Sequence, residues 1–521
     1  MAKNKIFGID LGTTNSLIAF WDHGKVNVLA NEYGETTTPS CPITEGKHPK
    51  FKVVVDDSER QISPEEVAAI ILTKLKDIAT ARGQQVKDVV ITVPAYFSED
   101  QRNSTKIAGE MVGLNVLKII PEPVAAALAF GFASGCGLEG KVLVYDLGGG
   151  TFDIAIVDIS STGCYHVLST NGNTHLGSAN FIGRLMNYTV KRLGKETHAT
   201  MLMIRTACEK AIKQLSSVES AEINIGDNSI TITRGEYERM ISGYVASAME
   251  CVKNALHDAD VEKDEISKVV LVGGCSQTPF IRTCLKDFFE KDLSTEVNPM
   301  EAIAHGACIY GAVLKKMPGA PNMYLRNSTP LTIGLVGPNK VCTPLIPRNT
   351  PFPVEEPRNG CTSKDNQQRA RFEVFEGENL HLDGNTILGS MCMEGIHPAP
   401  KHEEKFKVWL KINEDGVISA RTKYLRSNEE KELVIDRPNK FTSEELAQMS
   451  RWVAQLQRDV QPSSSPLVSS QPKKKRSRKG SKLKKRNIEA STEEGEEVRC
   501  PIYGGGLNAM NCESSEFVVE D

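Results

Sequence analysis

Two segments of the chain share a pattern that suits phosphate binding. In each, an apolar strand ends at an aspartate and runs into a turn of glycine and threonine, at residues 6–14 and again at 142–151. Glycine lets the backbone approach phosphate oxygens closely, and successive amide groups of such a turn form an anion-binding nest. Asp10 and Asp146, which end the two strands, could hold a magnesium ion through its waters. Two such turns facing each other would clamp a polyphosphate between two lobes.

The main alternative is plain hairpin geometry, which better explains a single glycine-rich turn. Two copies with matched acids favour phosphate binding, because a matched pair is hard to explain by chance. The chain has no Walker A sequence, so the pattern is not that of a P-loop protein. A third strand ends at Gly273 and Gly274, where a base or ribose could lie against the backbone. A helix bearing Glu209, Lys213 and Ser216 could supply the remaining contacts to the nucleoside.

Glu122 is an acid held between Pro121 and Pro123. The flanking prolines fix its backbone, which suits an acid that acts in hydrolysis or signalling. A glutamate that caps a turn explains the same pattern equally well, so the sequence leaves both interpretations open.

The elements that must position these residues alternate between strands and helices over residues 1–317, as in an α/β domain. Apolar runs such as 142–145 and 269–272 predict strands, and the spacing of apolar residues over 64–82 predicts a helix. Proline and glycine then interrupt the pattern and predict a linker over 318–327.

The rest of the chain divides into three parts. Short alternating runs separated by Gly, Pro and Asn predict an all-β unit over 328–440. Thr442 and Glu445 have capping-box spacing, which predicts a helix over 441–461. Residues 462–521 hold too few apolar side chains to form a core, so we expect a disordered tail with a basic stretch and an acidic end.

The net charge of the 521 residues is only −4, but it is unevenly distributed. Of the residues at 473–486, ten are Lys or Arg and none is acidic, so the rest of the chain carries −14. The negative charge outside residues 473–486 is not typical of a protein that binds nucleic acid in general. We expect contact with nucleic acid only through this basic stretch. No apolar run approaches the roughly 20 residues that span a bilayer, and no leader pattern opens the chain. We therefore expect a cytoplasmic protein with no membrane partner.

The chain resembles the 70-kDa heat-shock chaperone family over about residues 5–458. Several long motifs in the family's order carry the resemblance and make it specific. They read GIDLGTTNS at 8–16, VPAYF at 93–97, EPVAAA at 122–127, DLGGGTFD at 146–153, VLVGG at 270–274, FEGE at 375–378 and GIHPAP at 395–400.

The resemblance implies an actin-like, two-lobed ATPase domain of the α/β class, followed by an all-β sandwich that binds peptides. In that family, ATP binding opens the peptide site and hydrolysis closes it, which gives cycles of capture and release of unfolded segments. The implied cofactors are ATP or ADP with Mg. The implied partners are unfolded client polypeptides, with J-domain co-chaperones and nucleotide-exchange factors as further candidates.

Carried over by motif, the resemblance implies a role for each candidate residue. Asp10 and Asp146 would organise magnesium and its waters. Glu122 and Asp153 would complete the hydrolytic site by positioning the attacking water and stabilising charge. The residues expected to bind ATP are Gly12, Thr13, Thr14, Asn15, Gly148, Gly149, Gly150, Thr151, Glu209, Lys213, Ser216, Gly273 and Gly274.

Between Ile43 and Phe51 the chain is much shorter than the family, whose longer segment carries the catalytic lysine. Lys47 and Lys50 lie in the shortened segment, but neither matches the family's motif, so neither takes that role. Losing a preorganised cation beside the transferring phosphoryl group typically costs several powers of ten in rate. An ATP hydrolase therefore remains the leading interpretation, with slow turnover.

The nucleotide pocket also departs from the family. Lys213 and Gln277 each replace an arginine, and Met300 replaces an aspartate. A guanidinium group stacks flat on a base, whereas lysine and glutamine do so poorly, so we expect weaker nucleotide binding. Residues 178–180, Ser-Ala-Asn, replace Gly-Glu-Asp and remove a glycine from the phosphate loop.

The segments that connect the two domains and that cover the peptide site also differ from those of the family. Residues 322–327 replace the family's leucine-rich linker, which puts coupling between the domains in question. Pro344 and Pro347 would remove backbone donors from a strand near the peptide groove. The helical lid ends after its first helix, and residues 518–521 do not match the family's tail that docks helical-repeat co-chaperones.

Two functions fit these observations. The intact phosphate motifs favour an ATP-regulated chaperone that binds exposed apolar peptide segments. The altered pocket, linker and lid favour a degenerate, nucleotide-weak scaffold or regulatory peptide-binding protein. A small-molecule kinase of the same superfold ranks third, because no motif for a second substrate is visible.

The basic stretch at 473–486 is either a solvated tail or a signal for nuclear import, and the sequence gives both equal weight. If it is a signal, deleting it should reduce nuclear accumulation of a fluorescently tagged chain, because import receptors read clustered positive charge. Deleting the same length of chain at 487–500 is the control. An unchanged distribution would contradict the nuclear assignment.

Overall fold

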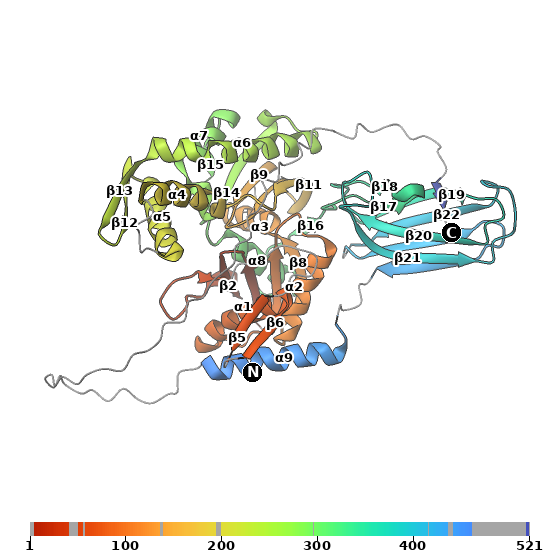
Figure 1. Ribbon diagram of the computed structural model, residues 1–521, viewed down its shortest axis with the longest axis horizontal. Helices are drawn as coiled ribbons and strands as arrows, with labels where there is room; N and C mark the ends of the chain where they lie inside the picture. Colours follow the sequence, from red (N-terminus) through yellow and green to blue (C-terminus); the bar gives the residue numbers. More distant parts are fainter. Residues whose placement is uncertain are drawn as a thin grey trace.

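A computed structural model describes the protein at residues 5–40, 51–55, 58–135, 139–193, 200–294, 296–414, 416–435, 441–460 and 517–519. Lys47, Lys50 and the basic stretch at 473–486 lie outside the described residues. The described part consists of two α/β lobes, a β unit beside them, and helix α9 (Ser443–Val460) along the first lobe (Figure 1). No helix in these ranges is both long and apolar enough to cross a membrane.

The first lobe is a mixed sheet with helices on both faces. Its strand order is β3-β2-β1-β7-β8, with β1 antiparallel to β2 and parallel to β7. Because successive side chains of a strand point to opposite faces, Phe7 and Ile9 pack under α1 and α2, while Ile6 packs under α8. The elements are β1 (Ile6–Leu11), β2 (Asn15–Asp22), β3 (Lys25–Val28), β4 (Thr38–Pro39), β5 (Phe51–Val55), β6 (Ser58–Ile62), α1 (Pro64–Ala81), β7 (Asp88–Val93), α2 (Glu99–Met111), β8 (Asn115–Pro121), α3 (Glu122–Ala133) and α8 (Ala302–Leu314).

The second lobe repeats this plan with the sheet order β15-β14-β9-β10-β11-β16. Its central strands β9 and β10 form a hairpin, as β1 and β2 do in the first lobe. Helices α4 to α7 cover one face, and α3 packs between the sheets of the two lobes. The elements are β9 (Gly140–Leu147), β10 (Phe152–Ile159), β11 (Cys164–Asn173), α4 (Ser178–Leu193), α5 (Met201–Leu215), β12 (Ser220–Ile225), β13 (Asn228–Thr233), α6 (Arg234–Asp258), η1 (Lys263–Glu265), β14 (Ile266–Val272), η2 (Gly274–Gln277), α7 (Pro279–Phe289), β15 (Leu293–Ser294) and β16 (Tyr324–Arg326).

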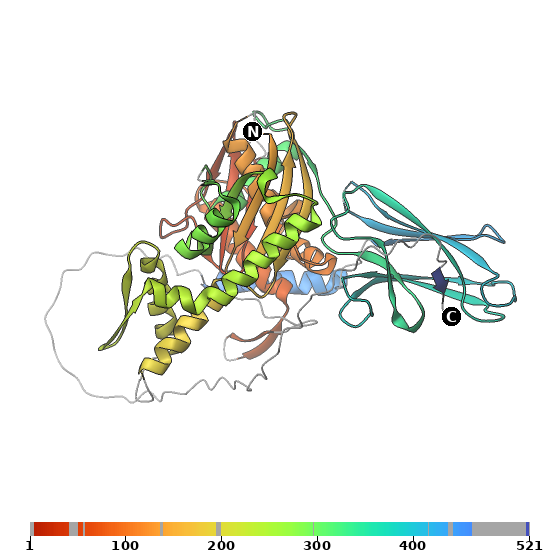
Figure 2. The same ribbon diagram turned by 90° about the horizontal axis from the view of Figure 1, so that it is seen from above.

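The β unit is a sandwich of two sheets, which Figure 2 shows beside the two lobes. Phe372 from one sheet and Phe406 from the other meet in a shared core, as their alternating strand patterns predicted. Pro344 lies in an edge strand, β18, where a missing amide donor is tolerated. The elements are β17 (Ile333–Val336), η3 (Pro338–Lys340), β18 (Cys342–Ile346), β19 (Val354–Thr362), β20 (Arg369–Glu376), β21 (Thr386–Glu394), β22 (Lys405–Ile412), β23 (Ile418–Tyr424) and β24 (Glu430–Ile435).

The predicted linker and the predicted tail each contain a strand. In the linker, β16 pairs in parallel with β11 and so joins the sheet of the second lobe. At the end of the tail, β25 (Phe517–Val519) pairs in parallel with β19. The expectation of a wholly disordered tail therefore does not hold at its end. Composition could not indicate this, because a short strand can pair with an existing sheet edge without forming a core of its own.

Helix α9 packs on the first lobe rather than over the β unit. The predicted capping box is present, because Thr442 donates its backbone N–H to Glu445 Oε2 at 2.7 Å and accepts from the Glu445 amide at 3.2 Å. Met449 and Val453 are buried against α1 and α2. The guanidinium carbon of Arg60 lies 4.1 Å from the ring centre of Trp452.

Replacing Met449 with alanine should loosen α9 from the first lobe. The substitution removes buried apolar surface and should cost about 2 kcal/mol at this contact. We expect faster limited proteolysis within α9, measured by mass spectrometry of the fragments. Gln448→Ala is the matched control, because Gln448 is exposed on the same helix. Equal cleavage rates in the two variants would show that this packing does not hold the helix.

Candidate functional site

The two phosphate-type turns lie face to face between the lobes. A Cβ atom placed on Gly149 would come within 1.8 Å of Thr14 Oγ1, and one on Gly150 would lie 3.2 Å from Thr13 Cγ2. The backbone of the second turn is thus packed directly against the side chains of the first. Glycine is required at position 149 because any side chain there would displace Thr14.

Residues at the start of α4 close the second turn from the other side. Ser178 donates its amide to Gly148 O and Ala179 donates to Gly149 O, both at 3.0 Å. A Cβ on Gly177 would lie 2.5 Å from the amide nitrogen of Gly150. The Ser-Ala-Asn sequence therefore keeps these backbone contacts to the turn, although it differs from the family's Gly-Glu-Asp.

Four carboxylates gather beside the turns. Asp10 ends β1, Asp146 and Asp153 are paired across β9 and β10, and Glu122 begins α3; all four are at most 7% exposed. Burial raises the pKa of Asp10 to about 7 and that of Asp153 to about 6. Burial, together with repulsion from the neighbouring acids, raises the pKa values of Glu122 and Asp146 well above their usual range.

The structure favours one of the two interpretations of Glu122. Pro121 is the N-cap of α3, and no side-chain hydrogen bond caps this helix among the described residues. The Glu122 carboxylate instead lies within electrostatic reach of Asp10, Asp146 and Asp153. It belongs to the acid cluster rather than to a turn cap.

The acid cluster has the chemistry of a cation site. Asp146 Oδ2 and Asp153 Oδ2 are buried and have no hydrogen-bond partner among the described residues. Buried charges normally require a partner of opposite sign, and a divalent ion would supply one here. Within the described ranges, no three His, Cys, Asp or Glu side chains are close enough to ligate one ion directly. The unpartnered acid oxygens suit a cation, and Asp10 and Asp146 are the residues that would hold magnesium through its waters, which stays a prediction.

Only part of the predicted nucleoside pocket adjoins this cluster. Gly273 has φ of 78°, and a Cβ placed on it would lie 3.1 Å from Asp146 Oδ1, so the end of β14 reaches the acids. A Cβ on Gly274 would lie 3.3 Å from Met300 Sδ. Met300 thus lies at the surface where a base was expected to stack.

The contacts predicted from α5 are not connected to the turns. Glu209 forms an ion pair with Arg205 at 2.8 Å, and Lys213 and Ser216 are exposed. None of the three predicted residues has a hydrogen bond or ion pair to the turns among the residues that the structure describes. Their role in nucleotide binding stays a prediction.

Comparison with known proteins identifies the family. The model of the family described as Hsp70 protein matches residues 6–43 and 41–498. The chaperone protein DnaK of Thermotoga petrophila is 36% identical over 501 residues, covering 86% of this chain and 83% of the relative. DnaK of Buchnera aphidicola is 33% identical over 516 residues, covering 85% and 80%. The chain belongs to the Hsp70 family. Membership supports an ATP-dependent chaperone function, since Hsp70 proteins bind ATP and ADP and the DnaK-like members bind unfolded polypeptides.

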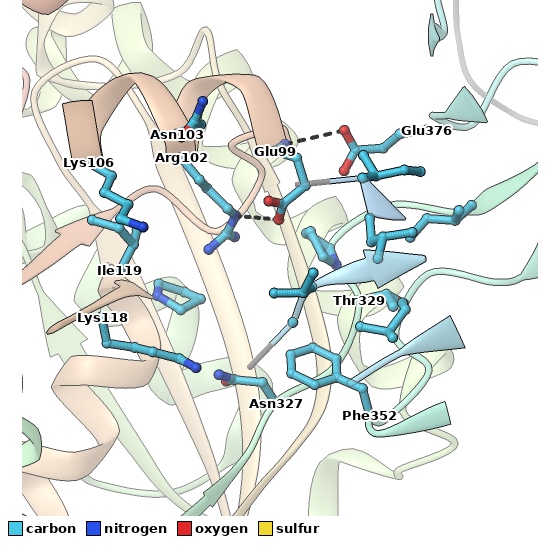
Figure 3. A pocket seen from close by; sticks show the side chains of 18 of the residues that line it. Glu99, Arg102, Asn103, Lys106, Lys118, Ile119, Asn327, Thr329, Phe352 and Glu376 are labelled. Atoms are coloured by element: carbon cyan, nitrogen blue, oxygen red, sulfur yellow. Dashed lines mark hydrogen bonds and ion pairs between the residues drawn. The ribbon is translucent and has the colours of Figure 1, made fainter. Parts of the chain in front are cut away.

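In this Hsp70 chain, hydrogen bonds connect the acid cluster to the β unit. Asp153 Oδ1 accepts from the Ala95 amide at 2.9 Å, and Ala95 O accepts from Arg102 Nη2 at 3.0 Å. Arg102 Nε lies 4.0 Å from Glu99 Oε1, and the Glu99 amide donates to Glu376 Oε2 at 3.3 Å (Figure 3). Ala95 and Glu376 belong to motifs visible in the sequence, but nothing in the sequence indicated that these motifs meet.

Two further contacts attach the β unit of the Hsp70 chain to the second lobe. Arg348 Nη2 lies 2.8 Å from Asp258 Oδ2 at the end of α6, and Asn349 Oδ1 accepts from the Thr170 amide at 2.9 Å. These contacts and the pairing of β16 with β11 hold the β unit on the second lobe, and the Glu99–Glu376 hydrogen bond attaches it to the first lobe. Sequence reasoning missed all of these residues, because none of them belongs to a motif with recognisable chemistry.

A cavity of about 490 Å³ lies where α2, β8, the linker and the β unit meet (Figure 3). Glu99, Arg102, Phe352 and Glu376 line it. Burial and the nearby Glu99 raise the pKa of Glu376 to about 7. Glu376 is 3% exposed, so its charge is poorly solvated at neutral pH.

Glu376→Gln should alter how stability depends on pH. The pKa of Glu376 is about 7 in the folded chain and has its usual value of 4.5 in the unfolded chain. Between pH 4.5 and about pH 7, Glu376 is therefore protonated in the folded chain and ionised in the unfolded chain. The stability of the wild type should therefore fall as pH rises through this window, whereas Gln mimics the protonated acid and keeps an acceptor for Glu99. We expect the variant to be more stable than the wild type by roughly 1–3 kcal/mol at pH 8 and nearly equal to it at pH 5. Urea unfolding at both pH values measures this difference.

Glu394→Gln is the control for this experiment, because Glu394 is an exposed acid of the same β unit. Its stability relative to the wild type should not vary with pH. If Glu376→Gln behaves in the same way as the control, the raised pKa of Glu376 is contradicted.

Proposed function

We propose that this Hsp70 protein binds Mg-ATP between its lobes with low affinity, hydrolyses it slowly, and uses the cycle to control binding of apolar peptide segments by the β unit. The observation that carries the proposal is the cluster of four buried acids beside the two facing turns. Two of its oxygens have no partner among the described residues. A magnesium ion with a polyphosphate between the turns would neutralise this cluster and use the turn amides.

The roles of the individual residues follow from their positions. Asp10 and Asp146 would hold the waters of the magnesium ion, and the ion when bound would neutralise phosphate charge. Glu122 and Asp153, with raised pKa values, are suited to orient the attacking water and accept its proton. Arg102 is a mostly buried cation in the hydrogen-bond network that begins at Asp153. Its side chain already donates to the carbonyls of Ala95 and Phe97. It would not replace the family's catalytic lysine, and this supports slow hydrolysis.

A second candidate function is a nucleotide-weak scaffold or regulatory peptide-binding protein. It is favoured by Met300 beside Gly274 and by Gln277, whose side-chain oxygen accepts from Arg282 at 3.3 Å. Both features occupy positions where the family presents groups that recognise adenosine. Under this alternative, the β unit would bind partners without regulation by ATP.

The partners follow from the proposal. Unfolded polypeptides are the proposed clients, and J-domain co-chaperones and nucleotide-exchange factors are proposed as regulators of the ATPase lobes. We propose a cytoplasmic location, with nuclear import through 473–486 as the extension tested by the deletion described above.

Asp10→Asn and Thr13→Ala should both weaken ATP binding in the presence of Mg²⁺. The first removes charge that faces the ion, and the second removes a hydroxyl donor of the phosphate turn. We expect at least a tenfold rise in Kd, which corresponds to about 1.4 kcal/mol, measured by titration calorimetry. Steady-state phosphate release, with and without an unfolded peptide, should be slow in the wild type and lost in both variants.

Asp227→Asn is the control, because Asp227 is exposed in the turn between β12 and β13. It should leave affinity and turnover unchanged. No detectable ATP binding by the wild type at millimolar nucleotide would reject the proposal in favour of the scaffold. Turnover equal in the wild type and in Asp10→Asn would reject the assigned hydrolytic site.

A further inference from the structure

The chain ends with a strand that returns to the β unit. β25 runs parallel to β19, with Phe517 opposite Gly360, Val518 opposite Cys361 and Val519 opposite Thr362. It forms the outer strand of the sheet β24-β23-β22-β19-β25 and also lies near β20. A segment that sequence reasoning assigned to a disordered tail is therefore an added strand of the sandwich.

β25 pairs with the buried end of β19, beyond the exposed stretch that contains a proline. The other edge of β19 is paired with β22 from Val354 to Cys361, so only its outer edge is open to a partner. Along this strand Glu355, Glu356 and Pro357 are exposed, and proline has no amide to donate. Burial begins at Gly360 and continues through Thr362, the stretch that pairs with β25.

The same stretch has an unused polar group. Thr362 is 1% exposed, and its hydroxyl has no hydrogen-bond partner among the described residues. A buried unpartnered hydroxyl is costly unless a ligand satisfies it. A segment that lies along this edge could supply that partner.

The occupant has the composition of a bound peptide. Phe and Val are aromatic and β-branched residues, which favour extended structure, and pairing of such a segment with a sheet edge is a common mode of peptide recognition. In this chain the segment is flanked by Glu516, Glu520 and Asp521. A short apolar core between acids is soluble when released and can pair when docked.

We infer that Phe517–Val519 is an internal ligand, which occupies in cis the open edge of β19 and competes with an extended apolar segment supplied in trans. This edge lies in the other sheet from β18, so it is a site separate from the peptide groove expected near Pro344. Residues 461–516 separate α9 from β25, so the tail is tethered to its own site. A tethered segment acts at an effective concentration that reaches the millimolar range, and a free peptide must exceed it.

The test compares the full chain with a chain that ends at Glu516. The probe is a fluorescein-labelled synthetic peptide of residues 513–521, and its binding is followed by fluorescence anisotropy. Removing the internal competitor should lower the apparent Kd of the probe by roughly 10- to 100-fold. Val518→Pro in the full chain should have the same effect, because proline removes an amide from the strand. Ser514→Pro is the matched control outside β25 and should behave as the full chain does.

Amide hydrogen exchange measures occupancy of the edge without reference to client binding. Exchange across 358–363 should be faster in the truncated chain and slow again when the unlabelled peptide is added. If truncation changes neither exchange nor probe affinity, the inference is overturned, whether or not the β unit binds clients. If truncation speeds exchange and the probe binds, but an unrelated leucine-rich heptapeptide binds neither chain, the internal strand is supported and the proposed chaperone function fails.

Discussion

Four buried carboxylates in one place are the constraint on which the arrangement of the two lobes depends. Each of Asp10, Glu122, Asp146 and Asp153 loses most of its hydration, and burial raises the pKa of all four. Such a cluster is unfavourable in an isolated protein, because unpaired charge is poorly tolerated away from water. Under the proposed function, a cation and a polyphosphate between the turns would lower this cost.

The acid cluster is also connected to the β unit through a series of contacts. Asp153 is held by the Ala95 amide, Ala95 by Arg102, and the segment that carries Arg102 contacts Glu376. The acid cluster and the interface with the β unit are thus joined by a short series of contacts. The linker, whose side chains differ from those of the family, contributes β16, which pairs with β11. Strand pairing uses backbone groups, so it tolerates a linker whose side chains differ from those of the family.

Parts of this architecture could be predicted, and the reason differs from element to element. The strand alternation that includes Phe372 and Phe406 predicted the sandwich, because a strand with one apolar face must bury it. The capping box at Thr442 predicted the start of α9, because that signal is local. The surface that α9 covers was not predictable, since its amphipathic pattern shows that one face is buried but not against what. The strand β25 was missed because its stability comes from β19 and not from its own composition.

The sequence by itself determined the identity of the chemical groups: two matched turns and the acids near their strand ends. It also determined the order of the domains, because hydrophobic periodicity and the positions of glycine and proline are properties of neighbouring residues. Only the tertiary structure decided that Thr14 touches Gly149, that Glu122 joins the acids, and that Glu376 loses its hydration at an interface. These properties depend on burial and on distances between segments far apart in the chain. Both quantities are set by packing, which local sequence patterns do not specify.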